Sequence, residues 1–170
     1  MNKEEFLENL KKKDQIRILF ICSGNIMRSA YAEMIFEKML FDKFGKTKII
    51  SESGAVEYVN DSIAYQTKKI LMEQGVSKNR INQFHPRHIN YYPEAFQNAD
   101  LILVMTRNHL YELQDEIYKD KTFLLTDFAF GEQIDIADPF FDGNINQSFA
   151  EVKEGLEEII RIFKKRGILS

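Results

Sequence analysis

The chain passes directly from an apolar run, Ile16 to Ile21, into the eight residues CSGNIMRS, and from there into an amphipathic stretch. This order predicts a buried strand, a tight loop and a helix in immediate succession. Gly24 allows the loop to turn, and the N-terminus of the helix presents unpaired N–H groups and the positive end of its dipole. The segment therefore predicts an anion-binding loop, with the thiol of Cys22 at its start and the guanidinium of Arg28 at its end.

Length and composition are those of an ordinary globular domain. At 170 residues, a chain can bury about 70% of its unfolded surface without disulfides or metals. The net charge of −3 and the acidic residues around Lys11 to Lys13 argue against nucleic acid as a partner. We expect no membrane insertion, because no stretch approaches the roughly 18 apolar residues of a spanning helix. The N-terminus lacks the apolar region of a secretory signal, which predicts a cytoplasmic protein.

Strands and helices alternate along the rest of the chain. We expect strands at 16–21, 48–53, 100–105 and 122–125, and helices at 29–44, 61–74, 93–98, from 106 onward and 147–165. Residues 76–92 and 126–146 are expected to be irregular. This alternation predicts a parallel, doubly wound α/β sheet with helices on both faces. Residues 1–14 are expected to be a helical extension of one domain spanning residues 15–170.

The single cysteine of the chain cannot form an internal disulfide. Its position at a strand end, inside an anion-binding loop, favours a reactive thiolate over a buried filler residue, since the loop amides, the helix dipole and Arg28 all stabilise negative charge there. We expect the Cys22 thiolate to attack a phosphate monoester, with Arg28 holding two phosphoryl oxygens. The backbone of the loop residues would bind the remaining phosphate oxygens; these residues are Ser23, Gly24, Asn25, Ile26, Met27 and Ser29.

A carboxylic acid for the leaving group is found late in the chain. Asp138 lies in the segment ADPFFDG, where Pro139 stiffens the backbone next to it. The two rings that follow, Phe140 and Phe141, are candidates for one wall of a slot for an aromatic leaving group, and Tyr58 is the candidate for the opposite wall.

Supporting roles are expected for three polar residues. Asn25 tolerates a left-handed backbone and can tie the loop to Ser53, and Ser29 can donate a hydrogen bond to the Cys22 sulfur. The three histidines are spaced too irregularly for a metal site, so we expect them at the surface or behind the site, and we expect no metal and no cofactor.

The motif CSGNIMRS after a strand, together with ADPFFDG late in the chain, resembles the low-molecular-weight protein tyrosine phosphatases. The resemblance implies a four-stranded parallel sheet in the order 2-1-3-4, in three layers, and metal-independent hydrolysis of phosphotyrosine in proteins through a phosphocysteine. By position it implies Cys22 as the nucleophile, Arg28 as the phosphate clamp and Asp138 as the general acid and base. We expect a monomer or a weak dimer.

The sequence departs from the family pattern at several positions. Met27 replaces a frequent second cysteine, which removes a reversible disulfide that protects the nucleophile. Phe140 and Phe141 replace tyrosines that can be phosphorylated, and the order Ser53-Gly54-Ala55 replaces the usual Ser-Ala-Gly. Ile26 resembles the tyrosine-directed members, whereas a threonine there is associated with phosphoarginine phosphatases.

Other functions fit the residues less well. An arsenate reductase of this fold needs further cysteines, and a sugar-phosphotransfer carrier domain has no use for Arg28 or Asp138. A phosphoarginine phosphatase and a phosphoprotein-binding module without turnover remain as alternatives to phosphotyrosine hydrolysis.

Overall fold

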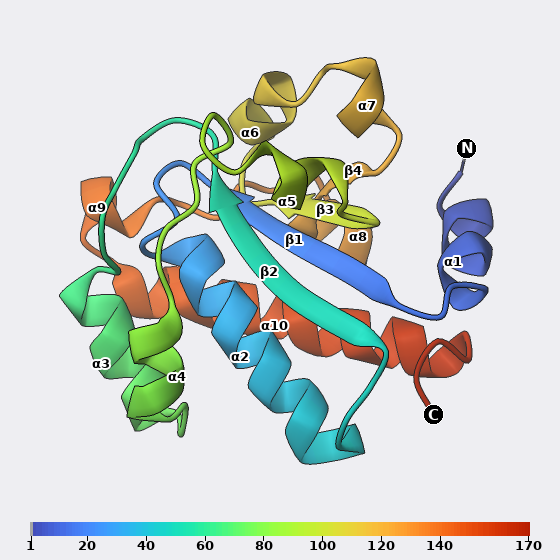
Figure 1. Ribbon diagram of the computed structural model, residues 1–170, viewed down its shortest axis with the longest axis horizontal. Helices are drawn as coiled ribbons and strands as arrows, with labels where there is room; N and C mark the ends of the chain where they lie inside the picture. Colours follow the sequence, from blue (N-terminus) through green and yellow to red (C-terminus); the bar gives the residue numbers. More distant parts are fainter. Residues whose placement is uncertain (1) are drawn as a thin grey trace.

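The structure, a computed structural model, describes residues 2–170. Within these residues, four parallel strands form one sheet in the order β2-β1-β3-β4 (Figure 1). The strands are β1 (Ile16–Cys22), β2 (Ile49–Ala55), β3 (Leu101–Val104) and β4 (Thr122–Leu124). The expected doubly wound sheet and its strand order are confirmed.

The apolar run of β1 is buried on both faces, as its composition predicts. Alternate side chains enter two separate cores: Ile18 and Phe20 pack into the larger one, and Leu19 and Ile21 into the smaller one. Because β1 lies between β2 and β3, its carboxyl end and the loop that follows reach the middle of the sheet edge.

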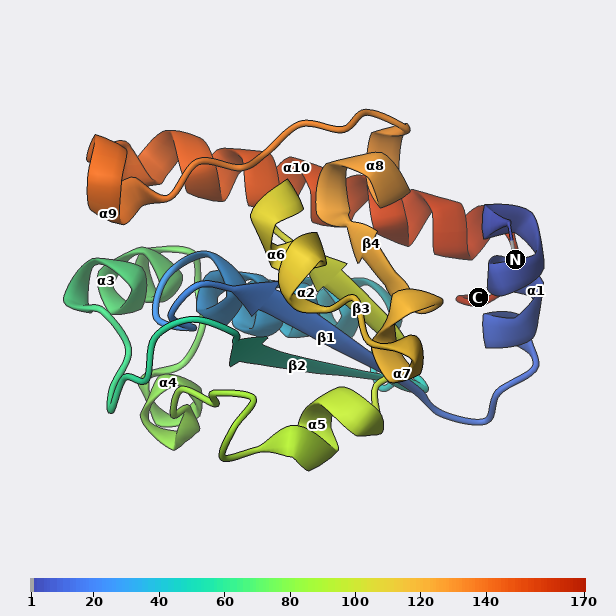
Figure 2. The ribbon, with the colours of Figure 1, turned by 90° about the horizontal axis from the view of Figure 1, so that it is seen from above.

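Helices cover both faces of the sheet, giving three layers (Figure 2). Side chains of α2 (Arg28–Phe44), α10 (Ile145–Lys165) and α8 (Leu125–Phe130) fill the larger core. The smaller core is closed by α5 (Pro93–Gln97), α6 (Arg107–Glu112) and α7 (Glu116–Lys119). The remaining short helices after β2 and before α10 are α3 (Tyr65–Glu73), α4 (Lys78–Gln83) and α9 (Pro139–Asp142).

Three expectations about local structure were wrong. The helix expected from Asp61 begins only at Tyr65, because the chain before it runs along the loop after β1, where the Ala64 N–H donates to the Ile26 carbonyl. The segment 76–92 contains α4, whose first turn is capped by the Ser77 side chain. The segment 126–146 contains most of α8 and all of α9, and Asp138 itself caps α9 by accepting the Phe140 N–H.

The N-terminal helix α1 (Lys3–Lys11) packs on the domain through Phe6, Leu7 and Leu10, and Phe6 meets Phe123 of β4 edge-to-face. Glu4 of α1 also pairs with Arg166, which directly follows α10, so α1 and the end of α10 meet at the end of the sheet away from the loop after β1 (Figure 1). Met1 lies outside the described residues, and the division of the chain at residues 14 and 15 stays a prediction.

None of the helices within residues 2–170 has the length and apolar character needed to cross a membrane.

Gly54 explains the altered order of small residues at the end of β2. A Cβ placed there would lie 2.8 Å from the Phe96 ring and 3.1 Å from the Arg87 carbonyl oxygen. We expect Gly54→Ala to lower the free energy of unfolding by about 1–3 kcal/mol, because a buried aromatic ring and a backbone carbonyl must both shift. Urea unfolding followed by circular dichroism measures this change.

Gly155→Ala is the matched control. A Cβ at Gly155 meets Leu125 at ordinary van der Waals distance, 3.4 Å, and alanine favours the helix. Equal losses of stability in the two variants would contradict the steric explanation for Gly54.

Candidate active site

The loop between β1 and α2 turns its carbonyl groups outward. The Cys22 carbonyl accepts the Val56 N–H, and the Ser23 carbonyl accepts the N–H groups of both Glu57 and Tyr58. The Ile26 carbonyl accepts the Ala64 N–H. The Gly24 carbonyl accepts the Asn60 side-chain amide, and the Ile26 carbonyl also accepts the Thr67 hydroxyl. Because a trans peptide points its N–H opposite to its carbonyl, the next N–H in each case points into the loop. The loop is therefore lined by amide donors suited to an anion.

Asn25 holds the shape of the loop. It has the only positive φ, 56°, of any non-glycine residue in the described part of the chain, a conformation that asparagine tolerates. Its buried Nδ2 donates to Ser29 Oγ (2.8 Å) and to Ser53 Oγ (2.9 Å), and its Oδ1 accepts the Arg87 N–H. The expected links from Asn25 to Ser29 and Ser53 are present.

The hydroxyl of Ser29 lies 2.9 Å from the Cys22 sulfur. Ser29 Oγ accepts from Asn25, and its own proton can be donated to the sulfur or to the Gly54 carbonyl oxygen, 3.5 Å away. The sulfur also accepts the Ser29 N–H at 3.5 Å. The Cys22 sulfur therefore lies within hydrogen-bond distance of both the hydroxyl and the backbone N–H of Ser29.

Glu33 of α2, which was not predicted from the sequence, completes this chain of hydrogen bonds. Its buried carboxylate accepts the Ser53 hydroxyl at 2.6 Å and pairs with Arg80 at 2.5 Å. With the Ser53 proton directed to Glu33, Ser53 Oγ accepts from Asn25, so the hydrogen bonds from Glu33 through Ser53 and Asn25 to Ser29 have assigned directions. A glutamate among the apolar residues of a helix was the available signal.

Arg28, at the start of α2, is 2% exposed and reaches across the loop. Its Nη1 donates to the Ile136 carbonyl (2.8 Å), and its Nη2 lies 3.3 Å from Asp138 Oδ2. Its Nε is the one buried side-chain nitrogen or oxygen of residues 2–170 without a hydrogen-bond partner. An unpaired donor on a buried guanidinium is costly unless a ligand accepts from it, so this nitrogen is a candidate donor to a bound anion.

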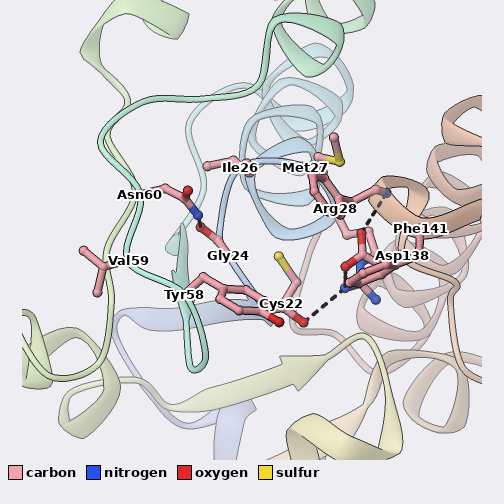
Figure 3. A pocket seen from close by; sticks show the side chains of 12 residues that line it. Cys22, Gly24, Ile26, Met27, Arg28, Tyr58, Val59, Asn60, Asp138 and Phe141 are labelled. Carbon is pink, nitrogen blue, oxygen red and sulfur yellow. Dashed lines mark hydrogen bonds and ion pairs between the residues drawn. The ribbon is translucent and has the colours of Figure 1, made fainter. Parts of the chain in front are cut away.

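Most of the expected site residues line one cavity of about 470 Å³ (Figure 3), whereas Asn25, Ser29 and Ser53 are not part of its lining. The Cys22 sulfur points into it, between Gly24 and Asn60 on one side and Arg28 and Asp138 on the other. Aromatic rings stand at the mouth: Tyr58 follows β2, while Phe140 and Phe141 belong to α9 and are 71% and 73% exposed. Rings this exposed do not anchor the loop to the core, and their role as walls of a substrate slot stays a prediction. The lining also contains Ser23, Ile26, Met27 and Val59.

The histidines differ from one another. His85 is exposed, His88 is buried beside the end of β2, and His109 of α6 is 1% exposed directly behind the loop. The Thr106 N–H donates to His109 Nδ1, so the proton of the neutral ring is on Nε2, which lies 3.0 Å from Ser23 Oγ. Burial, and then the charge of Arg28, lower the pKa of His109 to about 3, against a smaller opposing effect of Asp135.

A sequence profile described as low molecular weight phosphotyrosine protein phosphatase matches residues 17–166. The chain belongs to this family. Its members are cysteine-dependent phosphatases, and Cys22, Arg28 and Asp138 occupy one cavity as the resemblance implied.

Named relatives fall into two groups. A protein-arginine-phosphatase of Bacillus subtilis is 27% identical over 151 residues, covering 88% of this chain and 95% of that protein. The low molecular weight protein-tyrosine-phosphatase PtpB of Staphylococcus haemolyticus is 32% identical over 127 residues, which cover 74% of this chain and 82% of that protein. The crystal structure of YfkJ from Bacillus subtilis has the same fold, with a TM-score of 0.79 over 91% of this chain and 98% of that one, at 24% identity.

The neutral state of His109 has a consequence for stability. Its pKa is about 3 in the folded protein, against an ordinary value of 6.5, so between these values the unfolded chain binds the extra proton. Stability therefore falls as the pH drops through this range. Between pH 7 and pH 5 we expect His109 to account for a loss of about 1–2 kcal/mol in the free energy of unfolding.

Urea unfolding of the wild type and of His109→Gln at both pH values measures this loss, since glutamine does not titrate. The pH 7 to pH 5 difference should be smaller in the variant by that amount. An identical pH dependence in the two proteins would show that His109 does not stay neutral on folding.

Proposed function

We propose that this phosphatase hydrolyses phosphotyrosine in proteins, with Cys22 as nucleophile, Arg28 as phosphate clamp and Asp138 as general acid and base. The observation that carries the proposal is the unpaired Arg28 Nε at the base of a cavity that also holds the Cys22 sulfur. A phosphoryl group seated in the loop would accept from this nitrogen and from the inward-pointing amides.

In the first step the Cys22 thiolate forms a bond to phosphorus as the bond from phosphorus to the phenolic oxygen breaks. Asp138 gives its proton to that oxygen, and tyrosine leaves. In the second step water attacks the phosphocysteine, Asp138 takes a proton from the water, and the sulfur departs as a thiolate that accepts the Ser29 hydroxyl proton in a hydrogen bond. Inorganic phosphate is the second product.

Asp138 changes partners during this cycle. In the free protein its Oδ2 pairs with Arg28 Nη2, and its Oδ1 caps α9 through the Phe140 N–H. A guanidinium binds two phosphoryl oxygens at once, so the arriving substrate replaces the carboxylate on Arg28. Asp138 is then free to meet the leaving oxygen, while its bond to the Phe140 N–H keeps it over the cavity.

The cavity favours a phenolic leaving group. Tyr58, Val59, Phe140 and Phe141 line its mouth, and Ile26 adds a branched apolar side chain near the loop. A phosphoarginine substrate would place a charged guanidinium against these groups, at the cost of its hydration. We therefore propose tyrosine-phosphorylated proteins as the substrates, and a single cysteine that must stay reduced suits a cytoplasmic location.

Phosphoarginine hydrolysis is the second candidate, since two of the relatives are named protein-arginine-phosphatases. Matched peptides carrying phosphotyrosine, phosphoserine or phosphoarginine separate the candidates. We expect phosphotyrosine to have the highest kcat/KM, EDTA to have no effect and Cys22→Ser to abolish phosphate release. A higher kcat/KM for phosphoarginine than for phosphotyrosine would overturn the proposed substrate. If the wild type binds these peptides but releases no phosphate, that result would support a non-hydrolytic binding module.

Asp138→Ala tests the general acid. We expect kcat for phosphotyrosine peptides to fall by about 100-fold, the usual scale of general acid catalysis. The loss should be much smaller for p-nitrophenyl phosphate, because p-nitrophenolate leaves without a proton. Asp142→Ala, which changes an exposed carboxylate of the same short helix, is the control. Equal losses on both substrates would contradict the proposed role of Asp138.

A further inference from the structure

Ser23 connects the clamp to a buried histidine that the reaction itself does not use. Its hydroxyl oxygen lies 3.5 Å from Arg28 Nη2, 3.0 Å from His109 Nε2 and 3.3 Å from Glu57 Oε1. Two of these partners can only donate, since the guanidinium has no acceptor and His109 holds its proton on Nε2. Ser23 therefore accepts from Arg28 and His109 and donates to Glu57, which uses the whole hydrogen-bonding capacity of the hydroxyl.

His109 of α6 sets the direction of the hydrogen bonds at Ser23. The Thr106 N–H occupies His109 Nδ1, so the ring can present only an N–H to Ser23. His109 is 1% exposed, and the Glu57 carboxylate lies 3.9 Å from its Nε2 on the side of solvent. The Ser23 oxygen is thereby held with a lone pair available to the guanidinium.

The hydrogen bond from Arg28 to Ser23 becomes important when substrate binds. In the free protein Arg28 Nη2 is shared by Asp138 and Ser23, and the proposed cycle requires Asp138 to leave. Once Asp138 has left, Ser23 Oγ accepts from Nη2 of Arg28 and the Ile136 carbonyl accepts from Nη1. These two bonds keep the guanidinium plane in the orientation in which it can bind two phosphoryl oxygens.

We propose that His109 is a positioning residue for the phosphate clamp, acting on Arg28 through the Ser23 hydroxyl. The proposal deepens the proposed function and rests on it for the role of Arg28. If the proposal is right, a substitution of His109 weakens phosphate binding only while the Ser23 hydroxyl is present. A histidine that merely supports the fold would affect anion binding with or without that hydroxyl.

The test measures the Kd of inorganic phosphate by calorimetry in six proteins, the wild type and five variants. Ser23→Ala removes the acceptor, and His109→Asn keeps an amide near the Thr106 N–H but cannot reach Ser23. We expect each to weaken phosphate binding by about 10-fold, the range for a hydrogen bond to a charged group. The double variant should be no weaker than Ser23→Ala alone. His109→Gln can place its amide N–H near the position of Nε2, and it should stay within about 3-fold of the wild type.

His88→Asn is the matched control, because His88 is also buried and its Nδ1 also accepts a backbone N–H, that of Asn90. It should keep phosphate affinity within about 2-fold of the wild type, the scatter expected for a site outside the network. Losses that multiply in the double variant, or unchanged affinity in His109→Asn, would overturn the proposal. If His109→Asn does not fold, unchanged affinity in Ser23→Ala overturns it equally well.

Phosphate binding and turnover separate the two proposals. A wild type that binds phosphate but releases none from p-nitrophenyl phosphate would overturn the proposed function, while the six affinities would still decide the role of His109. A wild type that does not bind phosphate would overturn both.

Discussion

The site depends on hydrogen bonds that hold the carbonyl groups of the loop after β1 away from its centre. Residues 56–67, which follow β2, supply most of these donors. Each outward carbonyl forces the next N–H inward, and four inward amides make a place for negative charge at the N-terminus of α2. The segment after β2 is thus part of the active site, although only Tyr58, Val59 and Asn60 within it line the cavity.

Behind this loop two hydrogen-bond chains run to opposite sides of the sheet edge. One leads from Cys22 through Ser29, Asn25 and Ser53 to Glu33. The other leads from Arg28 through Ser23 to His109. The first chain ends at the proposed nucleophile and the second at the proposed phosphate clamp, so side chains from α2, β2 and α6 hold both groups in place.

Much of the fold could be predicted from local sequence. The apolar run of β1 and the alternation of strands and helices sufficed for a doubly wound sheet, because burial on both faces requires such runs. The predicted ends of helices were wrong where contacts with distant residues outweighed the local sequence. Asp61 does not begin α3, because residues before Tyr65 hydrogen-bond to the loop after β1. Short helices such as α4 and α9 were missed because four to six residues carry little periodicity.

The sequence by itself determined that Cys22, the amide-lined loop and Arg28 belong together, because eight consecutive residues between a strand and a helix leave few other geometries. It also supplied Asp138 and Ser53 as candidates, but not their distances from the sulfur or the clamp. Only the tertiary structure decided that Asp138 pairs with Arg28, that Glu33 accepts from Ser53 and that His109 meets Ser23. These contacts join residues from separate helices and strands, and they exist because the packing of both faces of the sheet brings those elements to one edge.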